Sequence, residues 1–184
     1  MRADNNTLID ELLALTDRCT EAAEKFKSLS ESQLNYRQEP KKWSVLECLE
    51  HLNRYGDFYL PAIEKAIVGQ QGAVDGPFKS GVIGNWFAGL MKVNNGRITK
   101  MQTPADKNPL GSALNAGTID RFLQQQAKLR SLLQQARHTD LTRVKVPISL
   151  TRLVKLRLGD TFRFFVNHIE RHIIQAQKVN AAGV

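Results

Sequence analysis

The segment GDTFRFFVNHIERHIIQ, residues 159–175, combines a helical hydrophobic pattern with two histidines four positions apart. Its apolar side chains recur at three- and four-residue steps: Phe162, Phe165, Ile169, Ile173 and Ala176. That spacing places them along one face of an α-helix, which we expect to begin near Gly159 or Asp160 and to run to about Lys178. Because such a face must be covered by other apolar surfaces, the segment predicts a core of packed helices.

Three further segments carry the same periodicity. The first covers roughly residues 5–29, the second begins at Ser44 and continues to about Ala66, and the third covers 119–136. Each has one apolar stripe, and no convincing run of strands accompanies them. The sequence therefore predicts an all-α fold, a four-helix bundle in a single domain over residues 1–184.

The second helix has a marked beginning and an irregular interior. Ser44 precedes Glu47 by three positions, which is the order of a capping box. Pro61 lies inside the apolar pattern and lacks a backbone N–H, so it predicts a kink or a break in this helix.

A long connection, residues 69–117, separates the second helix from the third, and glycine and proline punctuate it. Within it, residues 82–93 predict a short helix that includes Trp86 and Phe87. Two interpretations of the connection remain open: a surface excursion packed by these two rings, or a wall of an active-site pocket. Its length also predicts that the helices do not form a simple up-down-up-down array.

The net charge of +8 and the isoelectric point near 9.7 raise the hypothesis of a nucleic-acid partner. Much of the excess lies between residues 137 and 163, where Pro147 makes the secondary-structure pattern ambiguous: Arg137, Arg143, Lys145, Arg152, Lys155, Arg157 and Arg163. These charges are scattered, and no aromatic residues interleave them before Phe162. We therefore expect a solvated basic face and no tight binding to duplex DNA.

Other features concern the cellular compartment. The N-terminal residues lack the charged-then-apolar pattern of a signal peptide, which predicts a cytoplasmic protein. No apolar run approaches the ~20 residues of a membrane span. Cys19 and Cys48 fall on apolar helix faces, so we expect two buried thiols rather than a disulfide.

Three of the four histidines point to a metal site. His168 and His172 stack on one helix face, and His51 lies in the apolar stripe of the second helix. A surface pair is the ordinary meaning of this spacing, but buried imidazoles need partners, and one shared divalent ion would supply them. Three histidines leave coordination positions open for water or substrate, as in catalytic zinc sites. Zinc, nickel, iron and copper all suit imidazole, and Cys48 or Glu47 stays open as a fourth ligand.

Four residues near these histidines are candidates for lining a pocket: Glu47, Tyr55, Thr161 and Phe165. Each has an ordinary structural role as an alternative. Glu47 completes the capping box, which we favour over a general base, and core packing explains Tyr55 and Phe165. Arg171 is expected to project away from the apolar stripe, toward the surface or an interface.

The order of these motifs resembles the DinB/YfiT-like superfamily of metal-binding four-helix bundles. The resemblance is carried by Trp43-Ser44 with His51-Leu52, by Leu158-Gly159-Asp160, and by the terminal pattern of His168, Arg171, His172 and Gln175. It implies a metal triad of His51, His168 and His172, and often a homodimer. Some members of this superfamily are transferases or isomerases that use low-molecular-weight thiols. The basic stretch and residues 69–117 lie outside the resemblance.

Two functional hypotheses follow. In the first, the protein is a metal-dependent enzyme, either a hydrolase or a transferase of a small thiol such as bacillithiol or glutathione. In the second, it is a non-catalytic protein that binds nucleic acid or another anionic partner through its basic stretch. The histidines favour the first hypothesis.

Overall fold

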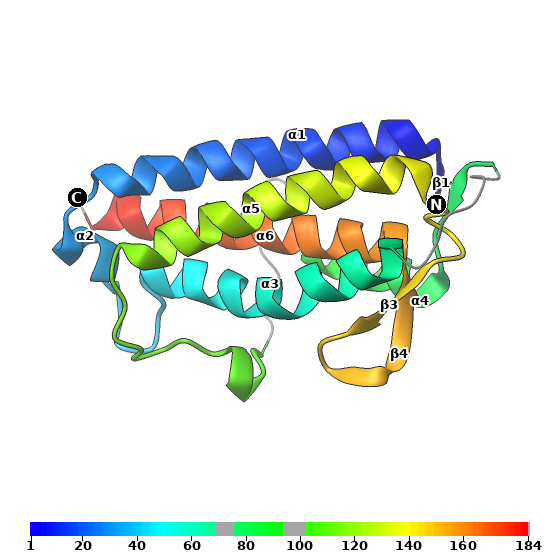
Figure 1. The fold of residues 1–184 in the computed structure, drawn as a ribbon. Helices are drawn as coiled ribbons and strands as arrows, with labels where there is room; N and C mark the ends of the chain where they lie inside the picture. The colour runs from blue at the N-terminus through cyan, green and yellow to red at the C-terminus, as the bar shows by residue number, and fades with distance from the viewer. Residues whose placement is uncertain (69–75, 94–101, 184) are drawn as a thin grey trace.

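The computed structural model describes residues 1–68, 76–93 and 102–183. Four long helices form the bundle: α1 (Asn5–Glu24), α3 (Val45–Val68), α5 (Gly117–Gln135) and α6 (Leu158–Ala182). α1 packs against α5 and α6, and α3 packs against the same two helices from the opposite side (Figure 1). The prediction of an all-α bundle is therefore confirmed.

The direction of the helices shows how the long connection is used. In Figure 1, α3 and α5 both run from the left end of the bundle to the right, whereas α1 and α6 run the other way. The chain must therefore return along the bundle between α3 and α5, and the predicted departure from an up-down-up-down order is confirmed. On the way it forms α4 (Val82–Met91), which packs against α6, and the short 3-10 helix η2 (Ala105–Lys107).

Smaller elements close the ends of the bundle. Strand β1 (Arg2–Ala3) pairs antiparallel with β2 (Phe78–Lys79), so the N-terminus is attached to the segment that precedes α4. The predicted first helix ends earlier than expected, because η1 (Lys25–Ser28) follows α1 and a separate short helix, α2 (Glu31–Asn35), comes next. Another 3-10 helix, η3 (Ala136–His138), follows α5 as η1 follows α1.

A hairpin lies between α5 and α6, where the sequence pattern was ambiguous. Strands β3 (Lys145–Ile148) and β4 (Thr151–Arg157) pair antiparallel, with a register irregularity after Pro147. The structure resolves this ambiguity in favour of strands, and the alternation of apolar and basic residues in β4 carried their period-2 signal. Pro147 is tolerated because a two-stranded ribbon leaves each strand with an unpaired edge.

The second helix continues through Pro61, so of the predicted kink or break, the break does not occur. Pro61 removes the N–H that would bond to the carbonyl of Asp57. Both residues lie on the exposed side of α3, where water can take the place of the missing donor. Cys19 and Cys48 are both buried with free thiols, as expected.

Asp160 anchors α4 to the start of α6. Its side chain is fully buried and accepts hydrogen bonds from the Ser80 hydroxyl, from the Gly81 backbone N–H at 2.8 Å and from Arg163 at 3.1 Å. Gly84 packs directly on this carboxylate: a Cβ at that position would lie 2.4 Å from Asp160 Oδ2. Only glycine lets the two helices approach this closely.

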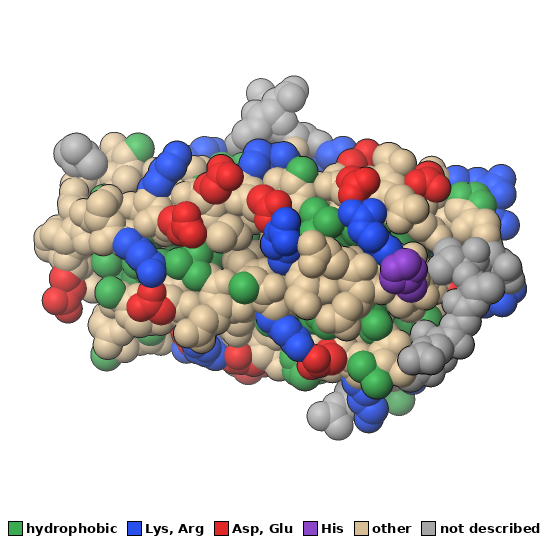
Figure 2. All heavy atoms as spheres, turned by 45° about the horizontal axis from the view of Figure 1, so that its top comes forward, with side chains coloured by type: hydrophobic (Ala, Val, Ile, Leu, Met, Phe, Trp, Pro, Cys, Tyr) green, Lys and Arg blue, Asp and Glu red, His purple; other side chains and the backbone are tan. Residues whose placement is uncertain are grey.

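Acidic and basic side chains intermingle on the face of the bundle that Figure 2 shows. Several arginines of the basic stretch have acidic partners: Arg137 pairs with Asp10, Arg143 with Asp140, and Arg163 with Asp160. Their charge is thereby partly offset. Among the described residues, no helix is both long and apolar enough to cross a lipid bilayer.

Candidate metal centre

Three histidines from two helices meet inside the bundle. His51 comes from α3, and His168 and His172 come from successive turns of α6. The three residues are 2%, 4% and 8% exposed, and one ring nitrogen of each lies within 4.8 Å of the other two. The packing of α3 against α6 therefore brings together the residues that the spacing singled out.

The separation of the nitrogens suits a shared ion. His51 Nε2 and His168 Nε2 are 3.2 Å apart. Two nitrogens that bind one zinc ion tetrahedrally, each at about 2.0–2.1 Å, lie about 3.3 Å from one another. The three buried histidines could thus hold a metal ion without a large movement of either helix.

Hydrogen bonds at Nδ1 orient two of the three imidazole rings. His51 Nδ1 lies 2.7 Å from the carbonyl oxygen of Lys107, and His172 Nδ1 lies 3.0 Å from Gln175 Oε1. Because these oxygens only accept, each Nδ1 must carry the proton, and the lone pair is left on Nε2. This is the outer-shell arrangement that fixes the tautomer of metal-binding histidines. His168 Nδ1 is buried and has no hydrogen-bond partner among the described residues.

The surroundings favour neutral imidazoles, the form that binds metals. Burial lowers the pKa of His51 to about 4. The hydrogen bond to the Lys107 carbonyl raises this pKa, whereas the nearby cations Arg54, Lys107 and Arg171 lower it further. Burial also holds the pKa values of His168 and His172 well below the usual range, with further repulsion from His51 and Arg171. Protons therefore compete weakly for these nitrogens near neutral pH.

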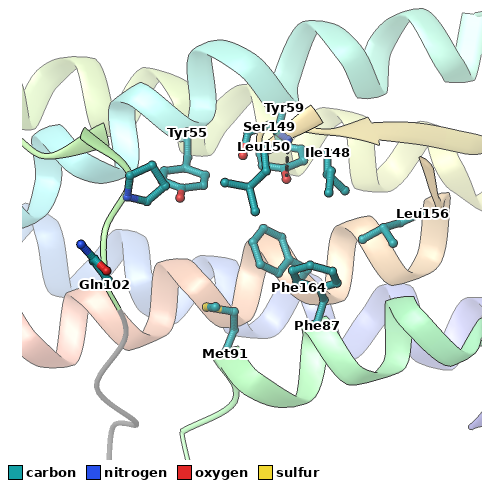
Figure 3. Close-up of a pocket in the computed structure, with 11 residues that line it drawn as sticks. Tyr55, Tyr59, Phe87, Met91, Gln102, Ile148, Ser149, Leu150, Leu156 and Phe164 are labelled. Carbon is teal, nitrogen blue, oxygen red and sulfur yellow. Dashed lines mark hydrogen bonds between the residues drawn. The ribbon is translucent and has the colours of Figure 1, made fainter. Parts of the chain in front are cut away.

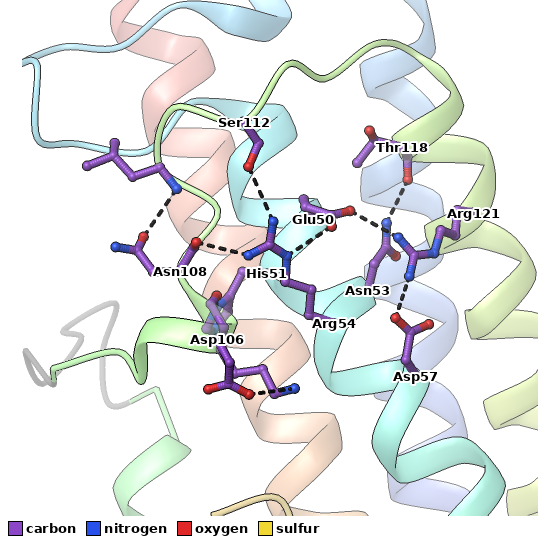
Figure 4. A network of polar contacts seen from close by, with 12 residues as sticks. Glu50, His51, Asn53, Arg54, Asp57, Asp106, Asn108, Ser112, Thr118 and Arg121 are labelled. Carbon is purple, nitrogen blue, oxygen red and sulfur yellow. Dashed lines mark hydrogen bonds and ion pairs between the residues drawn. The ribbon is translucent and has the colours of Figure 1, made fainter.

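The carbonyl that orients His51 is itself held in place. Arg54, one turn further along α3, donates to the Asn108 carbonyl at 2.9 Å and to the Ser112 hydroxyl at 3.2 Å (Figure 4). It also pairs with Glu50 at 3.0 Å. The segment after η2 is therefore fastened to the helix that carries His51, and Lys107, the last residue of η2, directly precedes it.

A sequence model of the DinB superfamily matches residues 10–176, which include all three histidines. The chain belongs to the DinB superfamily. Neither a search of curated proteins nor a search of solved structures found a match.

The three histidines of this DinB chain border a small pocket. Its other described lining residues are Tyr55, Met91, Gln102, Thr103, Pro104 and Arg171. Tyr55 contacts two of the histidines, with ring centroids 4.9 Å from His51 and 4.6 Å from His168. Of the four lining candidates taken from the sequence, it is the one that lies here.

Arg171 corrects an expectation of the sequence analysis. It was expected to point away from the core, but it is 6% exposed and lines the pocket beside the histidines. Arg171 is three residues after His168, so both lie on nearly the same side of α6. Its i,i+3 spacing from His168 could have predicted that Arg171 lies beside the histidines; the sequence analysis judged Arg171 by the apolar stripe alone.

Thr161 and Phe165 are not among the residues that line the pocket. Both are buried: the Thr161 hydroxyl donates to the Arg157 carbonyl at 3.1 Å, and the Phe165 ring packs on Tyr59 at 5.4 Å. For Phe165, the sequence left open pocket lining or core packing, and the structure shows core packing. Of the two interpretations of the connection 69–117, the pocket wall applies to its described residues Met91 and Gln102 to Pro104, although no local signal singled out these particular residues.

Glu47 lies away from the pocket, in the capping box. Its backbone N–H donates to Ser44 Oγ at 3.2 Å, and its carboxylate accepts from the Ser44 N–H at 2.9 Å. The same carboxylate accepts two hydrogen bonds from Arg37, at 2.6 and 2.8 Å, and one from the Gly111 N–H at 2.7 Å. Its lone pairs are thus engaged, which favours the cap over a general base.

Glu47→Gln should therefore lower the free energy of unfolding by about 1–3 kcal/mol at neutral pH, because it removes the charge that Arg37 and the Gly111 N–H address. Metal content should not change. Urea unfolding of Glu47→Gln, Arg37→Gln and the double variant checks this, since coupling between the two positions should appear as non-additive losses. Strictly additive losses would contradict the pairing.

The same group predicts a dependence of stability on pH. Burial alone would raise the pKa of Glu47, but hydrogen bonds from Arg37, Ser44 and Gly111 outweigh it and lower the pKa below its ordinary value of 4.5. Its contribution is then fully present above pH 4.5 and is lost as the pH falls through the lowered value. The stability difference between the wild type and Glu47→Gln should shrink over that interval. A difference that stays constant in acid would contradict this.

Proposed function

We propose that this protein binds one divalent metal ion through His51, His168 and His172 and uses it to activate a small thiol for transfer to a second substrate. The observation that carries the proposal is the convergence of three buried, neutral imidazoles, two of which are held with Nε2 free of a proton. Zinc, nickel and iron all suit this donor set.

A divalent ion held there would act as a Lewis acid that lowers the pKa of a bound thiol or water. The choice of a thiol rests on what surrounds the histidines. None of the described residues that line this pocket is a carboxylate. Metal-dependent hydrolases commonly place a glutamate beside the ion as a general base, and Glu47 is engaged elsewhere. A thiol that has lost its proton needs no such base.

Arg171 and Tyr55 would bind the substrate. Arg171 lines the pocket next to the histidines, and a guanidinium suits an anionic group such as a carboxylate of the thiol. Burial raises the pKa of Tyr55 to about 12, so its hydroxyl keeps its proton and can donate a hydrogen bond. In the transfer, sulfur forms a bond to an electrophilic carbon, the leaving group departs with the bonding electrons, and the thiol proton passes to solvent.

The test is a transfer assay on metal-loaded and chelated protein, with glutathione as the thiol and chlorodinitrobenzene as the electrophile. Zinc-loaded protein should accelerate thioether formation and chelated protein should not. Turnover of an ester panel without thiol would replace this proposal with a hydrolase. No turnover of either kind by fully loaded protein would remove the enzyme hypothesis.

Arg171→Gln should raise KM for glutathione about ten-fold, because it removes a charged partner of the anionic thiol. KM for mercaptoethanol, which carries no carboxylate, should change little, and it serves as the internal control. Equal effects on both thiols would mean that the variant disturbs the site as a whole.

A further inference from the structure

A second pocket lies next to the one that the histidines border, and it is apolar. Its cavity volume is about 120 Å³, near the ~150 Å³ of an apolar cavity that holds a benzene ring. The walls come from α3, α4, the β3–β4 hairpin and α6 (Figure 3). The aromatic and aliphatic side chains that line it include those of Tyr59, Phe87, Ile148, Leu150, Leu156 and Phe164.

The two pockets are adjacent and share part of their walls. Tyr55, Met91, Gln102 and Pro104 line both of them. The Phe164 ring, in the wall of the apolar pocket, stacks on the ring of His168 at 5.8 Å. A ligand that reaches the histidines is therefore next to the apolar pocket, and Arg171 lines the pocket in which it lies.

Hydrogen bonds between the elements hold the walls of the pocket. The Tyr59 hydroxyl accepts a hydrogen bond from the Ser149 N–H at 3.3 Å, which ties the hairpin turn to α3. Asn167 of α6 donates to the Ala88 carbonyl of α4 at 3.1 Å, close to Phe87. Because these elements are fixed by the fold, the pocket is preformed, and a ligand need not order it.

We propose that this pocket receives the aromatic or branched aliphatic body of a substrate whose thiolate or carboxylate end lies at the three histidines. This inference rests on the proposed metal site, and it assigns the substrate class: an amphipathic molecule with an apolar body and one soft or anionic end. A small, fully polar substrate would leave these aromatic walls exposed to water, which apolar burial disfavours.

The hairpin offers a matched pair of positions for a test. Leu150 lines the pocket and is 61% exposed, whereas Leu153, on the same hairpin, is 94% exposed and is not among the lining residues. Both are exposed enough for an aspartate to be tolerated. Leu150→Asp places a carboxylate at the apolar wall, and Leu153→Asp adds the same charge away from it.

The experiment measures the binding of two neutral thiols, ethanethiol and phenylethanethiol, to cobalt-loaded protein through the sulfur-to-cobalt absorption band. The wild type should bind phenylethanethiol at least about ten-fold more tightly, the preference expected for burying a phenyl ring. Leu150→Asp should reduce this preference to about three-fold or less, and Leu153→Asp should keep it. Equal affinities for the two thiols, or equal behaviour of the two variants, would overturn the proposal.

A metal-free arm separates this inference from the metal site. Benzyl alcohol should shift the methyl NMR signals of Ile148 and Leu156 in metal-free protein, because the apolar walls do not depend on the ion. If cobalt fails to bind while these shifts persist, the metal site is wrong and the apolar pocket stands as a binding site. If cobalt binds, but benzyl alcohol shifts no methyl signal and the two thiols bind with equal affinity, the apolar pocket is wrong and the metal site stands.

Discussion

Replacing His172 with alanine should abolish stoichiometric metal binding. The wild type, purified without a chelating tag, should contain about one divalent ion per chain, as expected for a three-histidine site. Loss of one of three protein ligands should weaken the affinity well beyond the 10–100-fold that changes in outer-shell partners typically cause. Elemental analysis gives the stoichiometry, and competition with a chromophoric chelator gives the affinity.

Two variants bracket this result. His138→Ala removes the remaining histidine, which is exposed and lies outside the site, and should leave the ion in place. Gln175→Leu removes the acceptor for His172 Nδ1 and should weaken binding by about 10–100-fold without abolishing it. Full occupancy in His172→Ala would refute the assignment of the ligands.

Adding a single methyl group to α4, at Gly84, should destabilise the fold. Gly84→Ala should lower the free energy of unfolding by about 1–3 kcal/mol, because the new Cβ overlaps the buried Asp160 carboxylate, which is held from three sides. Alanine is otherwise the better helix former by about 1 kcal/mol, so the sign itself is informative.

Gly89→Ala is the matched control in the same helix. A Cβ at Gly89 meets nothing within 4 Å among the described residues, so this change should be neutral or stabilising by up to about 1 kcal/mol. Urea unfolding of both variants measures the difference. Two similar values would show that α4 does not depend on close approach to α6.

Local signals were enough to predict the bundle and the histidine triad. Helical periodicity is set by neighbouring residues, and the i,i+4 spacing of His168 and His172 fixes their common face whatever surrounds them. The capping box of Ser44 and Glu47 is equally local, and it forms as expected. For the same reason the sequence placed His51 on the apolar face of its helix.

What the sequence did not predict depends on contacts between distant residues. Arg37 and Gly111 hold Glu47 from 10 and 64 positions away, and no pattern around Glu47 announces them. The hairpin is short and contains Pro147, so its alternation was too brief to outweigh the breaker. The apolar pocket combines residues of α3, α4, the β3–β4 hairpin, α6 and the loop before η2, and only the packed fold shows that they face one another.

The hydrogen bond between His51 and the Lys107 carbonyl spans 56 positions of the chain and joins a bundle helix to the connection that crosses the bundle. Metal occupancy and the placement of this connection are then thermodynamically linked, and linkage is reciprocal. An ion that selects the oriented form of His51 stabilises the docked connection by the same free energy that docking adds to the affinity for the ion. A ligand that displaced the connection would therefore also promote release of the ion.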